Sequence, residues 1–436
     1  MSNEHQFDVV VVGGGPAGIA AAVCAVESGL RVGIVDDSPT AGGQIWRGEQ
    51  ARPSAAQPAR WFQRLRDSRV QFLAGASVIE QPEKRVLLAE TFQGIHWIAF
   101  DKLILATGAR ERFLPFPGWT LPNVMGAGGL QALVKGGLSI EQKRVIVAGS
   151  GPLLLPVAAY LKKRGAKVSL IAEQAPWSRL VRFGAGLWRH PRKLFQAIGL
   201  NGQLSGVRFV TSCWPAAAQG DGQLENVTLH TQGGTWAEAC DYLACGFGLV
   251  PNLELPSLLG CKIENNVVTV DDWQQTSVPD MFCAGELTGI GGVELSLVEG
   301  QIAGYAAAGR TEDARGYFKQ RRKLKAFSES LNQTFALRDE LKSLASPDTM
   351  VCRCEDVPLK SLQGRHSWRE AKLQTRCGMG PCQGRICGAA TQFLLGWNVE
   401  SMRPPLFPAL VSSLASGVSG SRCQVIGEAA LLEPDT

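Results

Sequence analysis

The sequence predicts an α/β protein built on two dinucleotide-binding, Rossmann-like units, with a small cysteine-rich domain at the C-terminal end. Three observations support this prediction. A strand, a glycine-rich turn and a helix follow one another in residues 9–36, a similar segment returns in residues 144–173, and five of the twelve cysteines fall between Cys352 and Cys387. A chain of 436 residues is long enough for about three domains of ordinary size.

The first unit contains the parts of a dinucleotide-binding βαβ motif in the expected order. Four consecutive valines, typical of a buried parallel strand, precede Gly13, Gly15 and Gly18, which have the spacing G-x-G-x-x-G. The first glycine permits a tight turn, the second lets backbone approach a pyrophosphate, and the third lets the helix pack closely on the strands. Residues 31–35 favour the second strand, and Asp36 follows it where a carboxylate binds ribose hydroxyls. We therefore expect a bound adenine dinucleotide in preference to a purely structural turn.

A second copy of this motif lies 136 residues further on, with two departures. The glycines of the phosphate-facing turn return as Gly149 and Gly151, but Leu154 replaces the third glycine. Ala172 occupies the place of the ribose-binding acid, with Glu173 one residue late. A leucine at this close-packed point separates helix from strand or fills space that a ligand needs. We expect a degenerate unit, packing without a ligand or holding another nucleotide, in preference to one that binds NAD(P)H.

The other segments of the first 310 residues read as elements that complete these two units. Short apolar runs predict strands at 70–73, 85–89, 96–100, 102–106 and 278–286. Two glycine turns predict hairpins within residues 202–236, and small residues predict a helix at 295–308. Residues 315–343 favour amphipathic helices, and the proline-rich residues 403–415 favour an extended arm docked on this chain or on a partner.

Composition excludes several classes of protein. A net charge of +5 is too small and too scattered to indicate nucleic acid as a partner, and 19% charged residues is ordinary for a globular chain. The polar start lacks the parts of a signal peptide, and no run reaches 18 apolar residues, so we expect a soluble protein with no transmembrane segment. Twelve cysteines in a cytoplasmic chain indicate thiol or metal chemistry rather than structural disulfides.

The late cysteines have the composition of a metal site. They lie in VCRCEDV (residues 351–357) and TRCGMGPCQGRICG (residues 375–388). Four thiolates suffice for an iron–sulfur cluster or a zinc ion, but zinc sites favour paired C-x-x-C knuckles, which are not found here. Four glycines supply N–H groups that can point at sulfur, and neighbouring arginines favour the added electron of a reduced cluster. We expect an iron–sulfur site in preference to zinc or inert thiols.

The first 310 residues resemble the two-dinucleotide-domain FAD reductases. The resemblance rests on GGGPAG with Asp36, on Ala-Thr-Gly at residues 106–108, and on Cys-Ala-Gly-Glu at residues 283–286. It implies an α/β fold of the FAD/NAD-linked reductase type, with FAD in the first unit and its ribityl chain held by Glu286. The disulfide reductases of this family carry a C-x-x-C pair, which this sequence lacks. The residues expected to bind FAD are Gly13, Gly15, Pro16, Ala17, Gly18, Asp36, Gly43, Gln44, Thr107, Gly108, Gly285 and Glu286.

The cysteine-rich segment resembles the 2Fe-2S domain related to bacterioferritin-associated ferredoxin. Its ending is also similar to that of the large subunit of anaerobic glycerol-3-phosphate dehydrogenase. The match implies that a 2Fe-2S cluster is held by Cys352, Cys354, Cys382 and Cys387. Cys377 is the fifth candidate, because its position need not be cysteine in that relative.

Nearly the whole chain resembles the FAD- and 2Fe-2S-containing subunits of multi-subunit amine dehydrogenases, a group that includes the corresponding subunits of opine oxidase, D-hydroxyproline dehydrogenase and hydrogen cyanide synthase. The resemblance implies that the partner is an amine-oxidase-like FAD subunit, which oxidises an amino acid, imino acid or opine. A small ferredoxin-like subunit often joins such complexes. This chain would pass the electrons to a respiratory acceptor, free in the cytoplasm or peripheral at the inner face of the membrane. The sequence shows no paired acid and base, so we name no catalytic proton-transfer residue.

Two other functions stay open. A stand-alone NAD(P)H-dependent FAD oxidoreductase requires the second glycine turn to work despite Leu154. A non-redox scaffold subunit would bind nucleotide and tie partners together, but a full cysteine set serves little structural purpose without metal.

The expected division of the chain follows from these motifs. It comprises the first part of the FAD domain (1–120), the degenerate nucleotide domain (121–245), the second part of the FAD domain (246–312), a helical linker (313–345), the 2Fe-2S domain (346–400) and a C-terminal arm (401–436).

Overall fold

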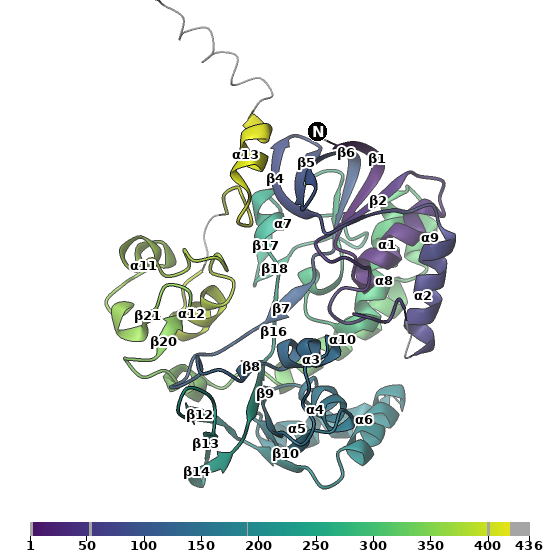
Figure 1. Cartoon of the computed structure of the whole chain (residues 1–436). Helices are drawn as coiled ribbons and strands as arrows, with labels where there is room; N and C mark the ends of the chain where they lie inside the picture. Colours follow the sequence, from purple (N-terminus) through teal and green to yellow (C-terminus); the bar gives the residue numbers. More distant parts are fainter. Residues whose placement is uncertain (1–2, 52–54, 190, 399–401, 419–436) are drawn as a thin grey trace, which may run out of the picture. The chain divides into compact units, whose positions relative to one another are not determined.

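The computed structural model describes residues 3–51, 55–189, 191–398 and 402–418 (Figure 1). The chain forms two compact units. Unit 1 comprises Met1–Gly108, Pro251–Leu324 and Ser401–Thr436, and unit 2 comprises Ala109–Val250 and Lys325–Glu400. The predicted six-part division stays a prediction. Each unit has a sheet and a core of its own.

Unit 1 is organised around a sheet with strand order β3-β2-β1-β6-β5-β4, in which β19 also pairs with β6. The central strand β1 is parallel to β2 and β6, and its valines are buried on both faces of the sheet, as is typical of a strand inside a parallel sheet. The strands are β1 (Asn3–Val12), β2 (Val32–Asp36), β3 (Gln71–Ala74), β4 (Ser77–Glu83), β5 (Val86–Thr91), β6 (Gly94–Leu105) and β19 (Met281–Cys283). The strands predicted at 96–100 and 102–106 are one strand, and β4 was not predicted.

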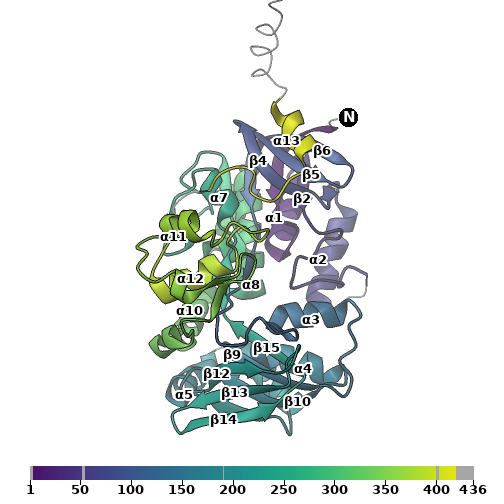
Figure 2. The same ribbon diagram turned by 60° about the vertical axis from the view of Figure 1, so that its left-hand side comes forward.

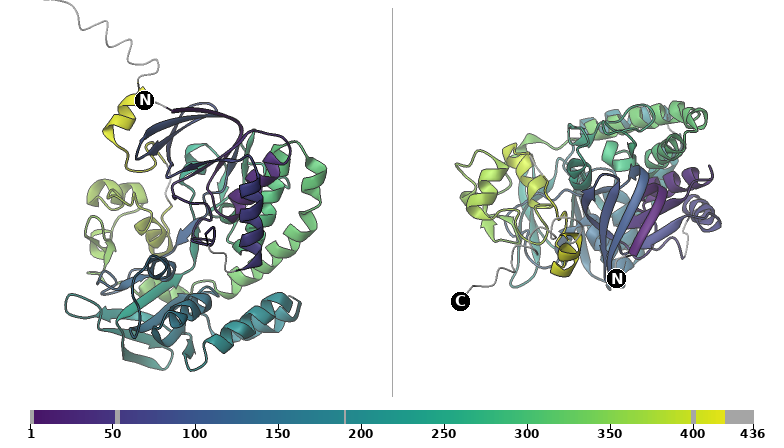
Figure 3. Two further views of the ribbon diagram at one scale, coloured as in Figure 1. Left: turned by 45° about the vertical axis from the view of Figure 1, so that its right-hand side comes forward. Right: turned by 90° about the horizontal axis from the view of Figure 1, so that it is seen from above.

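Helices α1 (Pro16–Val26) and α8 (Gly292–Ala307) lie side by side in unit 1 (Figures 1 and 3). Their close approach depends on glycine. A Cβ atom on Gly300 would lie 2.2 Å from the carbonyl oxygen of Ala17, and one on Gly304 would lie 2.3 Å from that of Ala21. Both helices bury small side chains against Val9 and Val11 of the sheet, so the start of α1 is held rigidly at the end of β1.

The remaining elements of unit 1 are short, apart from α2. They are α2 (Ala56–Asp67), α7 (Glu254–Leu258), β17 (Ile263–Glu264), β18 (Val267–Val268), α9 (Thr311–Arg315) and α13 (Val411–Val418). Helix α2 was not predicted, because most of its residues are polar and its buried side consists of Pro58, Trp61 and Phe62. Residues 402–410 of the arm form no helix or strand, the N–H of Leu410 donates to Glu90 Oε1 (2.9 Å), and α13 replaces the predicted extended structure beyond it.

Unit 2 contains a five-stranded parallel sheet with strand order β11-β10-β9-β15-β8 and a three-stranded antiparallel sheet (Figure 2). The parallel strands are β8 (Val124–Gly126), β9 (Arg144–Ser150), β10 (Lys167–Glu173), β11 (Arg208–Thr211) and β15 (Tyr242–Phe247). The helices that follow them are α3 (Ala127–Lys135), α4 (Leu154–Lys163), α5 (Trp177–Gly186) and α6 (Pro191–Gln203). The second strand–turn–helix–strand repeat is therefore confirmed.

The predicted hairpins are also confirmed. Strands β12 (Trp214–Gln219), β13 (Asn226–Thr231) and β14 (Gly234–Ala239) pair antiparallel in sequence order. Their turns contain the glycine signals of residues 220–222 and 232–234. A short pair, β7 (Ala109–Glu111) with β16 (Leu249–Pro251), completes the sheets of this part of the chain.

The cysteine-rich segment of unit 2 has a small core of its own. Trp368, Val351 and Val357 are buried there together with Cys352, Cys377 and Cys387. Its elements are β20 (Met350–Cys352), β21 (Val357–Pro358), α11 (Trp368–Thr375) and α12 (Cys387–Leu395), and the long helix α10 (Phe318–Thr334) precedes them. Among the described residues, no helix combines the length and the apolar character that a bilayer crossing requires.

Candidate functional site

In the glycine turn of unit 1, packing requires two of the glycines, whereas the third glycine faces open space. A Cβ atom on Gly13 (φ +109°) would lie 2.2 Å from the carbonyl oxygen of Ala106, and one on Gly18 would lie 1.8 Å from that of Gly13. A Cβ atom on Gly15 would meet no heavy atom within 4 Å. Packing therefore requires the first and third glycines. At Gly15 the space stays open, so a pyrophosphate would be able to approach the N-terminus of α1 there.

Asp36 is held in the position that the sequence predicts. Its carboxylate accepts hydrogen bonds from the N–H of Gly14 and from the N–H of Ser38, the latter at 2.7 Å. Burial raises the pKa of this carboxyl group, and the two N–H donors act in the opposite direction. The carboxylate is thus fixed at the end of β2, beside the glycine turn.

Two further predicted segments lie against this turn. The N–H of Gly42 donates to the carbonyl oxygen of Gly14 (2.7 Å), and a Cβ atom on Gly43 would lie 3.0 Å from the Cα of Gly15. On the other side, Ala106 touches the turn directly, and Thr107 and Asn252 exchange side-chain hydrogen bonds with each other's carbonyl oxygens (3.1 and 2.8 Å). The loop that contains Gln44 and the turn that contains Gly108 are therefore positioned on the same site.

The late glycine–acid pair completes the site. Gly285 (φ +78°) packs against α1, since a Cβ atom there would lie 2.8 Å from the Cβ of Ala17. The Glu286 carboxylate accepts hydrogen bonds from the N–H groups of Gly291 (2.9 Å) and Gly292 (3.0 Å) at the start of α8. The structure thus gathers the predicted FAD residues around the N-terminus of α1, and their individual contacts with FAD stay predictions.

Glu299 supports this site and was missed in the sequence. It lies in the middle of α8, is only 4% exposed, and accepts hydrogen bonds from the Gly285 N–H (3.0 Å) and the Thr288 hydroxyl (2.8 Å). Burial raises the pKa of its carboxyl group to about 7. The only signal in the sequence is a carboxylate in the middle of a helix that is rich in small and apolar residues.

The second glycine turn, in unit 2, retains more of the motif than its sequence indicates. Gly149 (φ +141°) is required by packing, because a Cβ atom would lie 2.0 Å from the carbonyl oxygen of Gly246. A Cβ atom on Gly151 meets no heavy atom within 4 Å, as at Gly15. Leu154 is buried at the start of α4 and packs near Gly246, so it fills core volume in place of the third glycine.

Glu173 lies one residue too late in the sequence for the ribose-binding acid, but in the structure it occupies the place of that acid. A register shift between Val168 and Leu170 inserts one residue into β10, so Glu173, and not Ala172, stands opposite Gly149. The interpretation that the second unit has lost its acid is therefore wrong.

The hydrogen bonds of Glu173 repeat those of Asp36. Its carboxylate accepts from the N–H groups of Gly151 (2.8 Å) and Ala175 (2.8 Å). In both units the acid bonds the N–H group 22 residues before it and the one 2 residues after it. Burial raises the pKa of Glu173 to about 7.

The five late cysteines form one cluster in unit 2. The sulfur atoms of Cys352, Cys377 and Cys387 lie within 4.8 Å of one another, close enough to share a metal ion. Cys382 interacts through its side chain with both Cys387 and Cys354, which brings the remaining two thiols to the same place. The structure therefore joins residues that are separated by more than twenty positions in the sequence.

Backbone N–H groups point at this cluster, as the glycine-rich sequence predicts. Those of Gly378 and Glu355 donate to Cys352, and those of Ile386 and Gly384 donate to Cys382. Hydrogen bonds from Cys377 and Cys387 lower the pKa of Cys352, and the same hydrogen bonds raise the pKa of Cys377 and Cys387, so the cluster favours a thiolate at Cys352 that is stabilised by its neighbours. Thiolate character with N–H donors fits an iron–sulfur cluster or a metal ion.

A cavity of about 280 Å³ opens beside the cluster. It is lined by Cys352, Cys354, Cys382 and Cys387, together with Trp119 and other residues of unit 2, but Cys377 does not line it. Cys377 is fully buried, next to the left-handed Gly378 that packs on Trp368. The cavity favours the four predicted ligands, whereas the sulfur distances favour a set that includes Cys377, and the assignment stays a prediction.

Comparison with known proteins defines the class. Residues 7–310 match the model of the pyridine nucleotide-disulphide oxidoreductase family, and the chain belongs to this family. It is therefore an FAD-dependent oxidoreductase with Rossmann-like domains, as the motifs of unit 1 predict.

Particular relatives extend over most of the chain. Hydrogen cyanide synthase subunit HcnB of Pseudomonas aeruginosa is 31% identical over 87% of this chain and 90% of that protein. An opine oxidase subunit of Agrobacterium tumefaciens is 30% identical over 91% of this chain and 87% of that protein. Among solved structures, L-proline dehydrogenase from P. horikoshii shares the fold with a TM-score of 0.68 at 18% identity, covering 95% of this chain and 80% of that chain. The resemblance of the chain to the corresponding subunits of hydrogen cyanide synthase and opine oxidase is thereby confirmed.

Proposed function

We propose that this chain is the electron-transfer subunit of a multi-subunit dehydrogenase or oxidase that acts on an amino acid, an imino acid or an opine. The observation that carries the proposal is the presence, in one chain, of a dinucleotide cradle at Gly15 and a cluster of five cysteines. When bound, FAD takes up two electrons, and a 2Fe-2S cluster passes electrons singly to a one-electron acceptor.

The residues of unit 1 support FAD binding at the N-terminus of α1. The open space at Gly15 and the free end of α1 would receive the pyrophosphate, and Asp36 would bind the adenosine ribose. Glu286, fixed by two backbone N–H groups, would face the ribityl chain. Each of these groups is held by backbone contacts, so the site is preorganised.

The cysteines of unit 2 would hold the 2Fe-2S cluster. We assign Cys352, Cys354, Cys382 and Cys387 as its ligands, because these four line the cavity. The N–H donors at Cys352 and Cys382 would stabilise the reduced cluster.

The relatives are named as subunits, which supports the proposal that this chain works together with partner chains. We propose an amine-oxidase-like flavoprotein as the subunit that oxidises a substrate of the opine, D-hydroxyproline or glycine type. A small ferredoxin-like subunit would complete the complex, and a respiratory acceptor would take the electrons at the cytoplasmic side of the membrane.

The position of the Glu173 carboxylate in unit 2 favours a second candidate function, that of a stand-alone NAD(P)H-dependent FAD oxidoreductase. Glu173 and the open space at Gly151 reproduce two features of the proposed FAD site in unit 1. Leu154 opposes this candidate, because it replaces the close-packed third glycine. Reduction by NAD(P)H therefore decides between the two functions.

The experiment compares the isolated chain with the complex that co-purifies from the native host. Candidate amino acids and opines are added anaerobically, and flavin bleaching is recorded. The proposal expects reduction of the flavin and the cluster in the complex and none in the isolated chain. Reduction of the isolated chain by an amine would assign substrate oxidation to this chain and contradict the proposal.

A further inference from the structure

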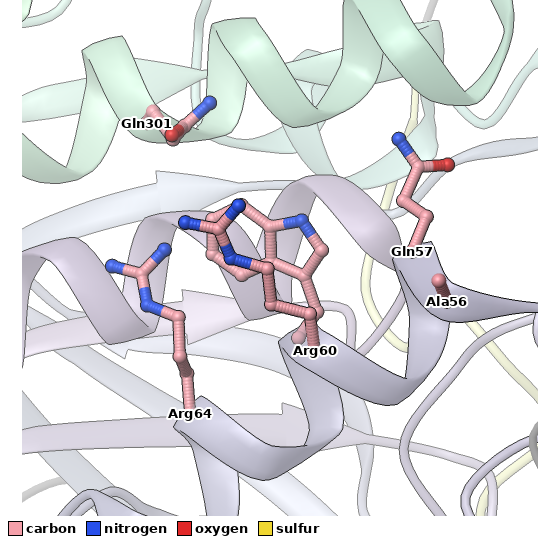
Figure 4. Close-up of a pocket in the computed structure, with 6 residues that line it drawn as sticks. Ala56, Gln57, Arg60, Arg64 and Gln301 are labelled. Atoms are coloured by element: carbon pink, nitrogen blue, oxygen red, sulfur yellow. The ribbon is translucent and has the colours of Figure 1, made fainter.

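A cationic hollow lies between α2 and α8 of unit 1, apart from the residues assigned to FAD. Its volume is about 330 Å³, within the range of small-molecule sites. Figure 4 shows Arg60 and Arg64 extending from α2 toward the side on which α8 carries Gln301. The lining residues are Ala56, Gln57, Arg60, Trp61, Arg64 and Gln301.

The polar groups of this hollow are suited to receive an anion. Arg64 stacks on the ring of Trp61, with its guanidinium carbon 4.4 Å from the ring centroid; it donates hydrogen bonds to Glu27 at 2.8 Å and also interacts through its side chain with Cys24. Arg60 is exposed, and within the described part of the chain it has no ion-pair or hydrogen-bond partner. None of the described residues that line the hollow carries a carboxylate; Gln57 adds a carboxamide, and so does Gln301, whose nitrogen also donates to the carbonyl oxygen of Leu297 (3.2 Å).

We propose that this hollow binds a small organic oxyanion, a carboxylate or a phosphate monoester, whose charge pairs with Arg60, with the guanidinium of Arg64 beside it. Planar guanidinium groups bind both anions through paired N–H donors. Ala56 and the edge of Trp61 supply an apolar wall for the body of the ligand. The proposal does not depend on the assignment of FAD or of the cluster.

The ordinary alternative is a solvated helix face, and α2 itself offers a matched control. Arg66 is also exposed on this helix but does not line the hollow, and it donates to Gln63 (2.6 Å). Arg60→Gln and Arg66→Gln remove the same charge from the same helix. A difference in anion affinity between these two variants therefore results from the hollow and not from the loss of net charge.

The test uses the full chain with its cofactors, at low ionic strength. Phenyl phosphate and benzoate are titrated calorimetrically, with benzyl alcohol as the uncharged probe of similar size. We expect one or both anions to bind, Arg60→Gln to weaken that binding by about tenfold or more, and Arg66→Gln to leave it within about twofold. The anion that binds more tightly identifies the ligand chemistry.

Three results of the titrations would overturn the proposal. These are no binding of either anion, equal weakening by both substitutions, or binding of benzyl alcohol as tight as that of the anions. The flavin spectrum of Arg60→Gln should match that of the unsubstituted chain, because Arg60 does not belong to the FAD site. A changed flavin spectrum would assign the hollow to that site and contradict a separate ligand.

Discussion

Replacing Glu299 by glutamine should remove a large part of the pH dependence of stability in unit 1. The carboxyl group is buried under the Gly285–Thr288 turn, and its pKa in the folded chain is about 7, against an ordinary value of 4.5. This difference corresponds to about 3 kcal/mol of unfolding free energy. Because the folded pKa is the higher one, the contribution is present below pH 4.5 and is lost as the pH rises through 7.

The glutamine oxygen can accept the same hydrogen bonds from Gly285 and Thr288 but carries no titrating proton. Urea unfolding of the FAD-loaded chain, followed by flavin fluorescence, measures the effect at pH 5 and pH 8. The difference in unfolding free energy between Glu299→Gln and the unsubstituted chain should shift in favour of the variant by up to about 3 kcal/mol between these pH values. Parallel pH profiles for the two proteins would refute the reasoning, because they would show that Glu299 does not titrate in this range.

The remaining predictions concern the other sites. Glu173→Gln should produce a similar loss of pH dependence, measured by urea unfolding with tryptophan fluorescence, because burial also raises the pKa of Glu173 to about 7. Gly15→Val should abolish FAD retention after gel filtration while the circular dichroism spectrum stays native, since its Cβ points into open space; Gly18→Ala should misfold, because its Cβ would lie 1.8 Å from a carbonyl oxygen. Cys382→Ser should remove the iron and acid-labile sulfide of the anaerobically purified chain, whereas Cys377→Ser should retain them; the opposite pattern would assign Cys377 as a ligand.

The sequence predicted those features that depend on local residue order. Gly13 and Gly18 are required by contacts with the carbonyl oxygens of neighbouring backbone, and this requirement is visible as a fixed spacing. The density of cysteines likewise predicted a cluster. The density alone does not say which four of the five cysteines are ligands, because that depends on the sulfur distances in the folded chain, which bring Cys377 close to Cys352 and Cys387.

The sequence-based prediction was wrong where one extra residue changes the pairing of two strands. The extra residue near Ser169 in β10 moves Glu173 into the place of the acid, and an alignment at constant offset puts Ala172 there instead. Helix α2 was missed because three buried residues decide its position within a polar stretch. Glu299 was missed because its partners, Gly285 and Thr288, come from another turn.

The most direct test of the central claim is reduction of the anaerobically purified chain, followed by absorption and low-temperature EPR spectroscopy. With dithionite, the account predicts bleaching of a flavin spectrum and the rhombic EPR signal of a reduced 2Fe-2S cluster. With NADH alone, it predicts no change in either spectrum. Rapid reduction by NADH would contradict the electron-transfer role and make this chain a nicotinamide-dependent reductase.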